Sequence, residues 1–382
     1  MVALKNCSNS VGKLTVQKQT MFLVSSLLLA GVALAPPVAG NAAEPLVLSN
    51  RQVNPQLNNL LRQARTRVNA KDFAGALKIY QQAASLNRDN PRIFSAIGYL
   101  QTLQGKFAEA TAAYKQALAL EPNNQDFHYA LAYSLANAGD NTAALAAYRR
   151  TLELNPNHVK AYLGLGAMLN RSGDDNGAID AFNRALALDP NNAQAYESLG
   201  AILLQQERTQ QALQTLQQAA ALAPTSSSVQ LKLATAWLRQ GNANAGLAVL
   251  KRAVQLEPKN PQLYLEMGKV LQAQQNFSLA LEAYQRAVSL KPDLIEAQAS
   301  IGEILMTQQD YQQAIVAYDR LIQLAPQNAA GYYKKAMALK KLDRTALAIQ
   351  ALEKARALYH RQGQTEGEQK ADTALQELKT SS

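Results

Sequence analysis

The sequence predicts an all-α protein built as a row of about nine helical hairpins, each 34 residues long. A helix-like phrase recurs, because residues 117–124 read ALALEPNN and residues 185–192, two periods later, read ALALDPNN. Strand-like alternation is absent, and a period of about 20–50 residues is typical of repeat architectures. Seven prolines keep the 34-residue period, and we call them the ladder prolines: Pro122, Pro156, Pro190, Pro224, Pro258, Pro292 and Pro326.

The first 43 residues have the features of an export signal. Leader lysines precede an apolar run at 21–35, which is shorter than the ~20 residues of a membrane span. Small residues follow, so we expect residues 1–43 to be a signal peptide cleaved near Ala42/Ala43. A retained N-terminal anchor is the alternative. Residues 44–56 are expected to be a linker, and the protein is expected to be exported to the periplasm.

The ladder prolines divide the chain into units. Proline is accepted just beyond a helix end and in a first turn, so each ladder proline marks a junction between two hairpins. Placing it at position 32 divides residues 57–362 into nine units. They begin at Leu57, Pro91, Gln125, Val159, Ala193, Ser227, Pro261, Ile295 and Ala329.

Within the units, small and large residues recur at fixed positions. Position 8 is Gly or Ala, position 20 is Ala except for Gly246, and position 24 is large, as in Tyr114 and Phe182. Small residues let two helices approach, and the large residue fills the adjoining space. Each unit is therefore predicted to be one helical hairpin.

Helix-capping residues also recur. Two residues after most ladder prolines stands an Asn or Ser that can cap the next helix: Asn124, Asn192, Ser226, Asn260 and Asn328. His158 and Leu294 are the exceptions at this position, and each follows an Asn or Asp that stands one residue earlier.

The fourth unit carries Tyr162, Leu165-Gly166, Leu169, Ala178, Phe182 and Pro190. This order resembles the tetratricopeptide repeat, and nine units in phase extend the resemblance over residues 57–362. The resemblance implies a right-handed α-solenoid, the superhelix of that family, that binds protein segments on its inner wall. Residues 363–382 are then expected to form a polar-faced capping helix and tail.

The resemblance places positions 2, 5, 9, 12 and 13 of each first helix on the inner wall. Tyrosine rings there supply contact area at low entropic cost, and cations hold carboxylates. The alternative is that these tyrosines only line the wall against the neighbouring unit. The candidate partner-binding residues are Arg92, Tyr99, Tyr129, Tyr133, Asn137, Lys160, Asn170, Arg171, Tyr333, Lys340 and Lys341.

The sequence offers little for catalysis. Cys7 is the only cysteine and lies in the expected signal peptide, and the three histidines have no evident catalytic partner. We therefore predict that the protein is not an enzyme. The candidates for a metal site are Asp174 and Asp175 in a turn, and Glu296 and Glu303 two turns apart on one helix.

Length, repeat number and export signal also resemble the exported processing-associated tetratricopeptide proteins of oxygenic photosynthetic bacteria. That resemblance implies a role in photosystem II assembly, with binding of the C-terminal tail of the D1 precursor and supply of manganese. The alternative is a structural or accessory envelope protein for cell-wall, secretion or pilus assembly.

Either reading predicts a monomer that binds another protein and touches inner or photosynthetic membranes only peripherally. We expect no nucleic-acid partner, because the positive charge gathers in residues 57–90, 227–260 and 329–362. A nucleic-acid binder would instead present a continuous basic stripe.

Overall fold

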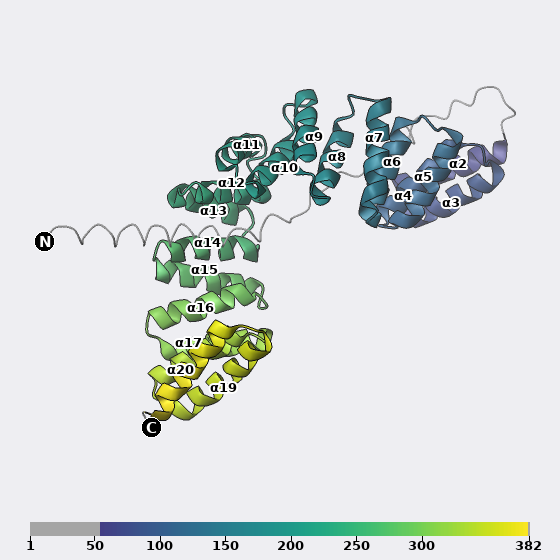
Figure 1. Cartoon of the computed structure of the whole chain (residues 1–382). Coiled ribbons are helices and arrows are strands. Elements are labelled where there is room, and N and C mark those ends of the chain that lie inside the picture. The colour runs from purple at the N-terminus through teal and green to yellow at the C-terminus, as the bar shows by residue number, and fades with distance from the viewer. Residues whose placement is uncertain (1–53, 381–382) are drawn as a thin grey trace. The chain divides into compact units, whose positions relative to one another are not determined.

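The computed structural model describes residues 54–380, so the expected signal peptide and most of the expected linker lie outside this range. Within it the chain forms nineteen helices and no strand, which confirms the all-α prediction (Figure 1). None of these helices is both long and apolar enough to cross a membrane. The chain divides between Ala223 and Pro224 into two compact units, called here the first and the second unit and described separately.

The first unit contains five hairpins, each made of an A helix followed by a B helix. Their helices are α2 (Pro55–Asn69), α3 (Phe73–Leu86), α4 (Pro91–Leu103), α5 (Phe107–Leu120), α6 (Gln125–Ala138), α7 (Asn141–Leu154), α8 (Val159–Arg171), α9 (Asp175–Leu188), α10 (Ala193–Gln205) and α11 (Thr209–Leu222).

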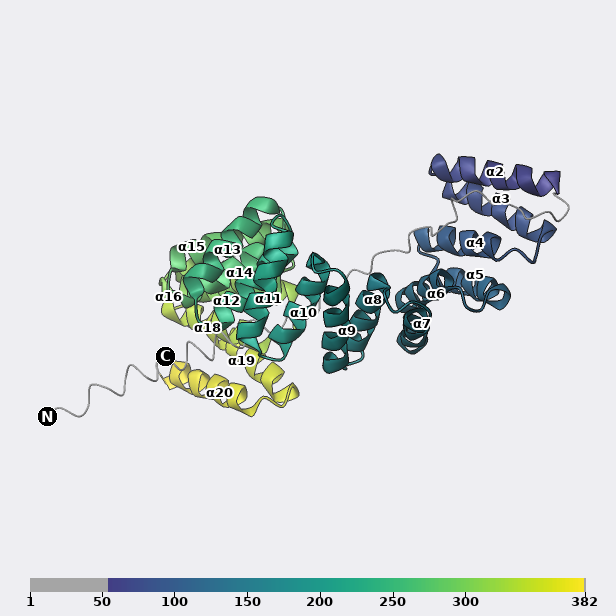
Figure 2. The ribbon, with the colours of Figure 1, turned by 90° about the horizontal axis from the view of Figure 1, so that it is seen from above.

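The second unit contains four further hairpins and the capping helix α20. Within each unit every A helix packs on its own B helix, and every B helix packs on the helix that follows it. Figures 1 and 2 show this side-by-side stacking. The helices are α12 (Ser227–Arg239), α13 (Ala243–Leu256), α14 (Pro261–Ala273), α15 (Phe277–Leu290), α16 (Ile295–Thr307), α17 (Tyr311–Leu324), α18 (Ala329–Lys341), α19 (Thr345–Arg361) and α20 (Thr365–Thr380).

The predicted helix caps are present. Asn124 accepts hydrogen bonds from the backbone N–H groups of Asp126 and Phe127, and Asn192 accepts one from Ala195. Ser226, Asn260 and Asn328 cap their helices in the same way. These bonds satisfy backbone donors that a helix start otherwise leaves unpaired, so the sequence fixes where most A helices begin.

In three A helices the side chain at position 4 donates a hydrogen bond to the ladder proline that precedes the helix. His128 donates from Nε2 to the carbonyl oxygen of Pro122 at 2.8 Å. Gln230 and Tyr264 donate to the carbonyl oxygens of Pro224 and Pro258 at 3.3 and 3.2 Å. A ladder proline has no N–H to donate. Its carbonyl oxygen accepts a hydrogen bond from the next A helix, and this bond connects the turn to that helix.

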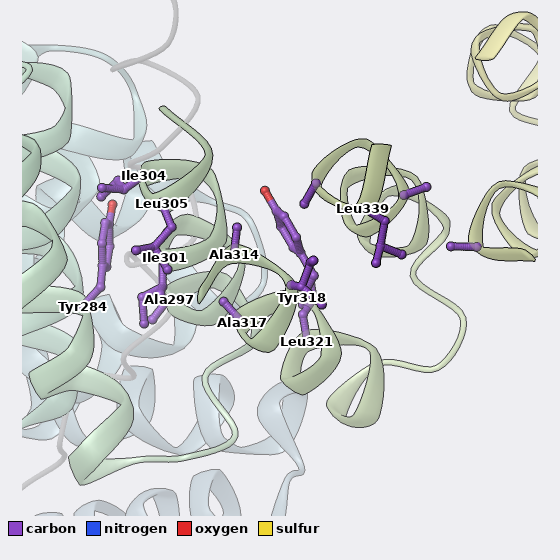
Figure 3. Close-up of a cluster of buried hydrophobic side chains, with 14 of the residues drawn as sticks. Tyr284, Ala297, Ile301, Ile304, Leu305, Ala314, Ala317, Tyr318, Leu321 and Leu339 are labelled. Carbon is purple, nitrogen blue, oxygen red and sulfur yellow. The ribbon is translucent and has the colours of Figure 1, made fainter. Parts of the chain in front are cut away.

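The core of each hairpin depends on contact between positions 8 and 24. A Cβ added at Gly166 would lie 2.9 Å from the ring of Phe182, and one at Gly268 would lie 2.7 Å from Tyr284. These rings therefore occupy the space that a larger residue at position 8 would need. Figure 3 shows Tyr284 and Tyr318 among the buried side chains of the second unit.

In the third hairpin the large side chain at position 24 extends to a different glycine. Its position 8 is Ala132, and the ring of Tyr148 instead extends to Gly164 on the next A helix, where an added Cβ would overlap it. Tyr148 is 0% exposed, and its hydroxyl has no hydrogen-bond partner. Gly164 therefore leaves room for the Tyr148 ring.

The capping helix α20 covers the end of the last hairpin. Ala371, Ala374, Leu375 and Leu378 are buried against α19, whereas the opposite face is polar. Charged pairs flank this contact: Lys340 lies 2.7 Å from Glu377, and Arg356 lies 3.2 Å from Asp372. The capping helix predicted from the sequence is thus present.

The Tyr148–Gly164 contact can be tested by substitution. Gly164→Ala is expected to lower the free energy of unfolding by about 1–3 kcal/mol, because the added methyl group forces the Tyr148 ring to move. Tyr148→Leu shortens the opposing side chain, so the double variant should lose less than the sum of the two single losses. Urea denaturation followed by circular dichroism measures this, and strictly additive losses would refute the contact.

Candidate functional site

Four of the five A helices of the first unit form one continuous layer. Helix α4 contacts α6, α6 contacts α8, and α8 contacts α10. We call the α4–α6–α8–α10 set the A-helix layer. This layer carries the candidate residues of the second, third and fourth hairpins: Arg92, Tyr99, Tyr129, Tyr133, Asn137, Lys160, Asn170 and Arg171. Tyr333, Lys340 and Lys341 belong to α18 of the second unit.

Two of the three candidate tyrosines of this layer are buried. Tyr129 is 7% exposed and Tyr133 is 9% exposed, whereas Tyr99 is only partly buried. The ring of Tyr129 lies 6.1 Å from that of Tyr148 across the hairpin. Burial raises the pKa of Tyr129 and of Tyr133, so both stay neutral. Tyr129 and Tyr133 therefore offer a partner little surface, and Tyr99 is the most exposed of the three candidate tyrosines of this layer.

His158 organises the N-terminal end of α8. Its Nδ1 accepts the backbone N–H of Ala161 at 3.1 Å, and its ring lies 4.7 Å from that of Tyr129. The proton of the neutral ring is then on Nε2. Burial lowers the pKa of His158, and its charged neighbours act oppositely, since Asp126 raises it and Lys160 lowers it. The Lys160 side chain itself is exposed.

Arg171 and Asn137 lie at the C-terminal ends of α8 and α6. Arg171 donates from Nη1 to the carbonyl oxygen of Ala136 at 3.4 Å, and Asn137 donates from Nδ2 to the carbonyl of Tyr133 at 2.8 Å. Asn170 donates to the Asp175 carboxylate at 3.0 Å. Asn170 is therefore committed to its own turn, whereas Arg171 remains exposed.

Within the described part of the chain, the cations of this layer have no ion-pair partner. Within residues 54–380, Arg92, Lys160 and Arg171 form no ion pair. The second unit differs, because Lys340 pairs with Glu377 of α20. There Lys341 is exposed and Tyr333 is partly buried.

Sequence reasoning missed a charge network in the second unit, in which Lys269 and Glu266 are buried and Glu296 is exposed. Lys269 is 5% exposed and lies 3.0 Å from Glu266, its neighbour on α14, and 2.7 Å from Glu296 on α16. Gln262 donates to Glu266 at 3.1 Å. Burial raises the pKa of Glu266 against the opposing effect of Lys269. The sequence did contain a sign of this network, namely a Glu at position 6 and a Lys at position 9 of the same helix. The second, third and fourth hairpins have Ala or Gly at position 6.

The candidate metal residues are already engaged. Glu296 pairs with Lys269, and Glu303 pairs with Lys334. Asp174 caps α9 by accepting the N–H of Gly177 at 2.9 Å. No group of three or more His, Cys, Asp or Glu residues within 54–380 is arranged to hold a metal ion. Manganese prefers several oxygen or nitrogen ligands, so these lysine-paired carboxylates do not fit it.

Successive hairpins and a contiguous layer of A helices define the class of helical repeat scaffolds. A family model described as "Cilia and flagella-associated protein 70 C-terminal domain" matches residues 51–299, and a tetratricopeptide-repeat model matches residues 299–361. Since the first match spans more than half of the chain, the chain belongs to that family of tetratricopeptide-repeat domains. The reference to cilia and flagella concerns the protein for which the family is named. Repeats of this kind generally act as protein-binding scaffolds rather than enzymes.

Solved structures agree on the fold. A tetratricopeptide repeat protein from Parabacteroides merdae is 18% identical, with 66% of this chain and 99% of that chain covered and a TM-score of 0.52. The C-terminal part of a repeat protein from Cytophaga hutchinsonii is 18% identical, with 62% and 97% covered and a TM-score of 0.53. The structure of YrrB, described as a TPR protein with an unusual peptide-binding site, is 23% identical, covers 49% and 96%, and has a TM-score of 0.43. No curated protein matches the sequence.

The His158 cap predicts a pH dependence of stability. Because the folded pKa lies below the ordinary value of 6.5, this contribution is present above pH 6.5 and is lost as the pH falls through the folded pKa. His158→Asn keeps an acceptor of the kind found at the other caps and should remove this dependence. His158→Ala should cost about 1 kcal/mol at neutral pH. Urea denaturation from pH 5 to 8 measures it, and an unchanged pH profile in the Asn variant would contradict the assignment.

The buried network predicts unequal effects of its members. Lys269→Met should destabilise the protein by roughly 3–5 kcal/mol, since it leaves Glu266 and Glu296 without their shared cation. Glu266→Gln should be far milder, because Lys269 keeps Glu296. The raised pKa of Glu266 contributes stability that is full below its ordinary value of 4.5 and is lost as the pH rises through the folded pKa. Unfolding measured between pH 4 and 8 should therefore show a flatter profile for Glu266→Gln, and equal losses for the two variants would disprove the network.

Proposed function

We propose that this chain is a non-enzymatic adaptor that holds a segment of another protein on the A-helix layer of its first unit. The observation that carries the proposal is that this contiguous layer presents Arg92, Lys160 and Arg171 without an ion-pair partner in residues 54–380. Membership of a family of protein-binding scaffolds supports the same conclusion.

The buried tyrosines give the A-helix layer a rigid surface on which a partner segment can bind. Tyr129 packs between Tyr148 and His158, and Tyr133 packs edge-on against Phe107 at 6.5 Å. A wall fixed before binding loses little conformational entropy when a partner arrives, so more of the interaction energy appears as affinity. The exposed cations then select the partner by its charge.

The proposal extends to the place of action and to one candidate partner. The basic leader and apolar run of the first 43 residues support export to the periplasm. The resemblance in length and repeat number supports a role in photosystem II assembly, with the C-terminal tail of the D1 precursor as the segment that is held. Manganese supply is not part of the proposal, because the candidate carboxylates are paired with lysines.

Capture from an envelope extract with a crosslinker tests the adaptor role. The parent protein should retain a defined partner that Lys160→Glu/Arg171→Glu loses, because the layer then repels an acidic segment. The matched control is Arg149→Glu/Arg184→Glu, which reverses two exposed cations on the B helices α7 and α9. Circular dichroism first establishes that all three proteins are folded.

Mass spectrometry of the captured protein identifies the partner. Identical capture by the parent and the Lys160/Arg171 variant would refute the placement of the function on the A-helix layer. Capture of a photosystem II precursor would support the finer role, and a reproducible partner from cell-wall synthesis or secretion would reject it.

A further inference from the structure

A cation recurs at position 26 in every hairpin of the second unit, on the B helix. All four side chains are exposed, and in the first unit the same position is Gln in three of the five hairpins. The unbroken series is therefore particular to the second unit. We call it the cation row, and its members are Arg252 on α13, Arg286 on α15, Arg320 on α17 and Lys354 on α19.

The cation row has no ion-pair partner within residues 54–380. The contacts of two of its members are with uncharged groups. Arg320 donates from Nη1 to the side-chain oxygen of Gln323 at 3.2 Å, and the Arg286 guanidinium lies 5.9 Å from the ring centroid of Tyr264. These contacts hold the two side chains over their helices and leave their charge facing solvent.

The carboxylates on the same stretch of the B helices do not balance this charge. Between positions 19 and 26, Lys251 adds a fifth exposed cation, and the acids are Glu282, Asp319 and Glu353. Asp319 pairs with Lys335 of α18 at 2.5 Å, so two unpaired carboxylates stand against five cations. The outer side of these helices therefore carries a net positive charge.

Three aliphatic side chains share this side of the B helices. Leu279, Val316 and Leu347 are 46%, 55% and 50% exposed, and they are the most exposed large hydrophobic side chains within residues 54–380. They stand at position 19 or 22, four or seven residues before the cation of the same helix. Residues at such spacings lie on one face of a helix, so α15, α17 and α19 each present an aliphatic side chain and a cation together.

The spacing of these groups distinguishes between possible occupants. A protein partner is usually met by a contiguous apolar core from which charged residues are depleted. Here the aliphatic side chains stand singly, one on each helix, with a cation beside each. A second copy placed symmetrically on this face would bring two cation rows together, which opposes association.

An anionic lipid surface fits both kinds of side chain. Lys and Arg are attracted to the negatively charged headgroups, and single aliphatic side chains enter the boundary between headgroups and acyl chains. Neither contact requires a helix to leave its hairpin or to cross the bilayer.

We propose that the B-helix side of the second unit docks on an anionic membrane surface through the cation row and through Leu279, Val316 and Leu347. The interaction is peripheral and reversible, since it rests on charge and on shallow insertion. It goes beyond the adaptor function and does not involve the A-helix layer, so each proposal can fail without the other.

The test measures binding of the protein to lipid vesicles by flotation. It uses residues 44–382, which keep every described residue and lack the apolar run at 21–35, since that run would itself enter vesicles. One set of vesicles is phosphatidylcholine with phosphatidylglycerol, and the other is phosphatidylcholine alone. The variants are Arg320→Gln/Lys354→Gln and Val316→Ser/Leu347→Ser, and the matched first-unit controls are Arg149→Gln/Arg184→Gln and Leu188→Ser/Leu222→Ser.

The parent is expected to bind the anionic vesicles and to leave the neutral ones, and added salt should release it. Arg320→Gln/Lys354→Gln should weaken binding about tenfold or more, because each cation near such a surface contributes about fivefold. Val316→Ser/Leu347→Ser should also weaken it, and both first-unit controls should bind like the parent. The substituted residues are exposed, and circular dichroism establishes that each variant is folded.

Several outcomes would overturn the inference. A parent that ignores anionic vesicles contradicts it directly. Equal weakening by Arg149→Gln/Arg184→Gln would mean that net charge alone draws the protein to lipid, without a docking face. A dimer in sedimentation equilibrium that Val316→Ser/Leu347→Ser dissociates would assign this face to a second copy. None of these results would change capture of a partner by the A-helix layer, so the adaptor function would stand.

Discussion

The whole array depends on the contact between a large side chain at position 24 and a residue at position 8 that has little or no side chain. The ring of Phe182 lies where a Cβ of Gly166 would be, and the ring of Tyr284 does the same at Gly268. This contact sets how closely the A and B helices approach, and it is fully buried in each case. In the third hairpin, where position 8 is Ala132, the Tyr148 ring lies where a Cβ of Gly164 on the next A helix would be.

Because this contact fixes the framework, the inner positions of the A helices are free to differ, and the two units use them differently. In the first unit they carry tyrosines and exposed cations. In the second unit position 9 supplies Lys269, which is buried between Glu266 and Glu296. A buried ion network is weak evidence for stability, since desolvation offsets most of the attraction. Its effect here is to join two specific hairpins, since Glu296 lies one hairpin beyond Lys269.

The sequence was sufficient for the hairpins, for most caps and for the capping helix, since these follow from local patterns such as Pro122 and Asn124. It was insufficient wherever the outcome depends on side-chain reach across hairpins. Glu303 and Lys334 are 31 residues apart, and no helical period says that their charged groups meet. His158 was passed over because its ring is not among the usual capping groups, yet its Nδ1 accepts the same kind of N–H. The burial of Tyr129 and Tyr133 likewise depends on contacts with Phe107, Tyr148 and His158, which the 34-residue period does not determine.

The ion pair of Lys340 follows from these same rules. A repeat array needs a polar-faced last helix, and α20 brings acidic residues to the cations of α18 and α19. The A-helix layer of the first unit is followed in sequence by further repeats instead, and in the turn after α8 Asp174 caps α9 while Asp175 accepts the Asn170 amide. Within residues 54–380, Arg92, Lys160 and Arg171 are therefore left without an ion pair, on the same layer of helices as the buried rings of Tyr129 and Tyr133.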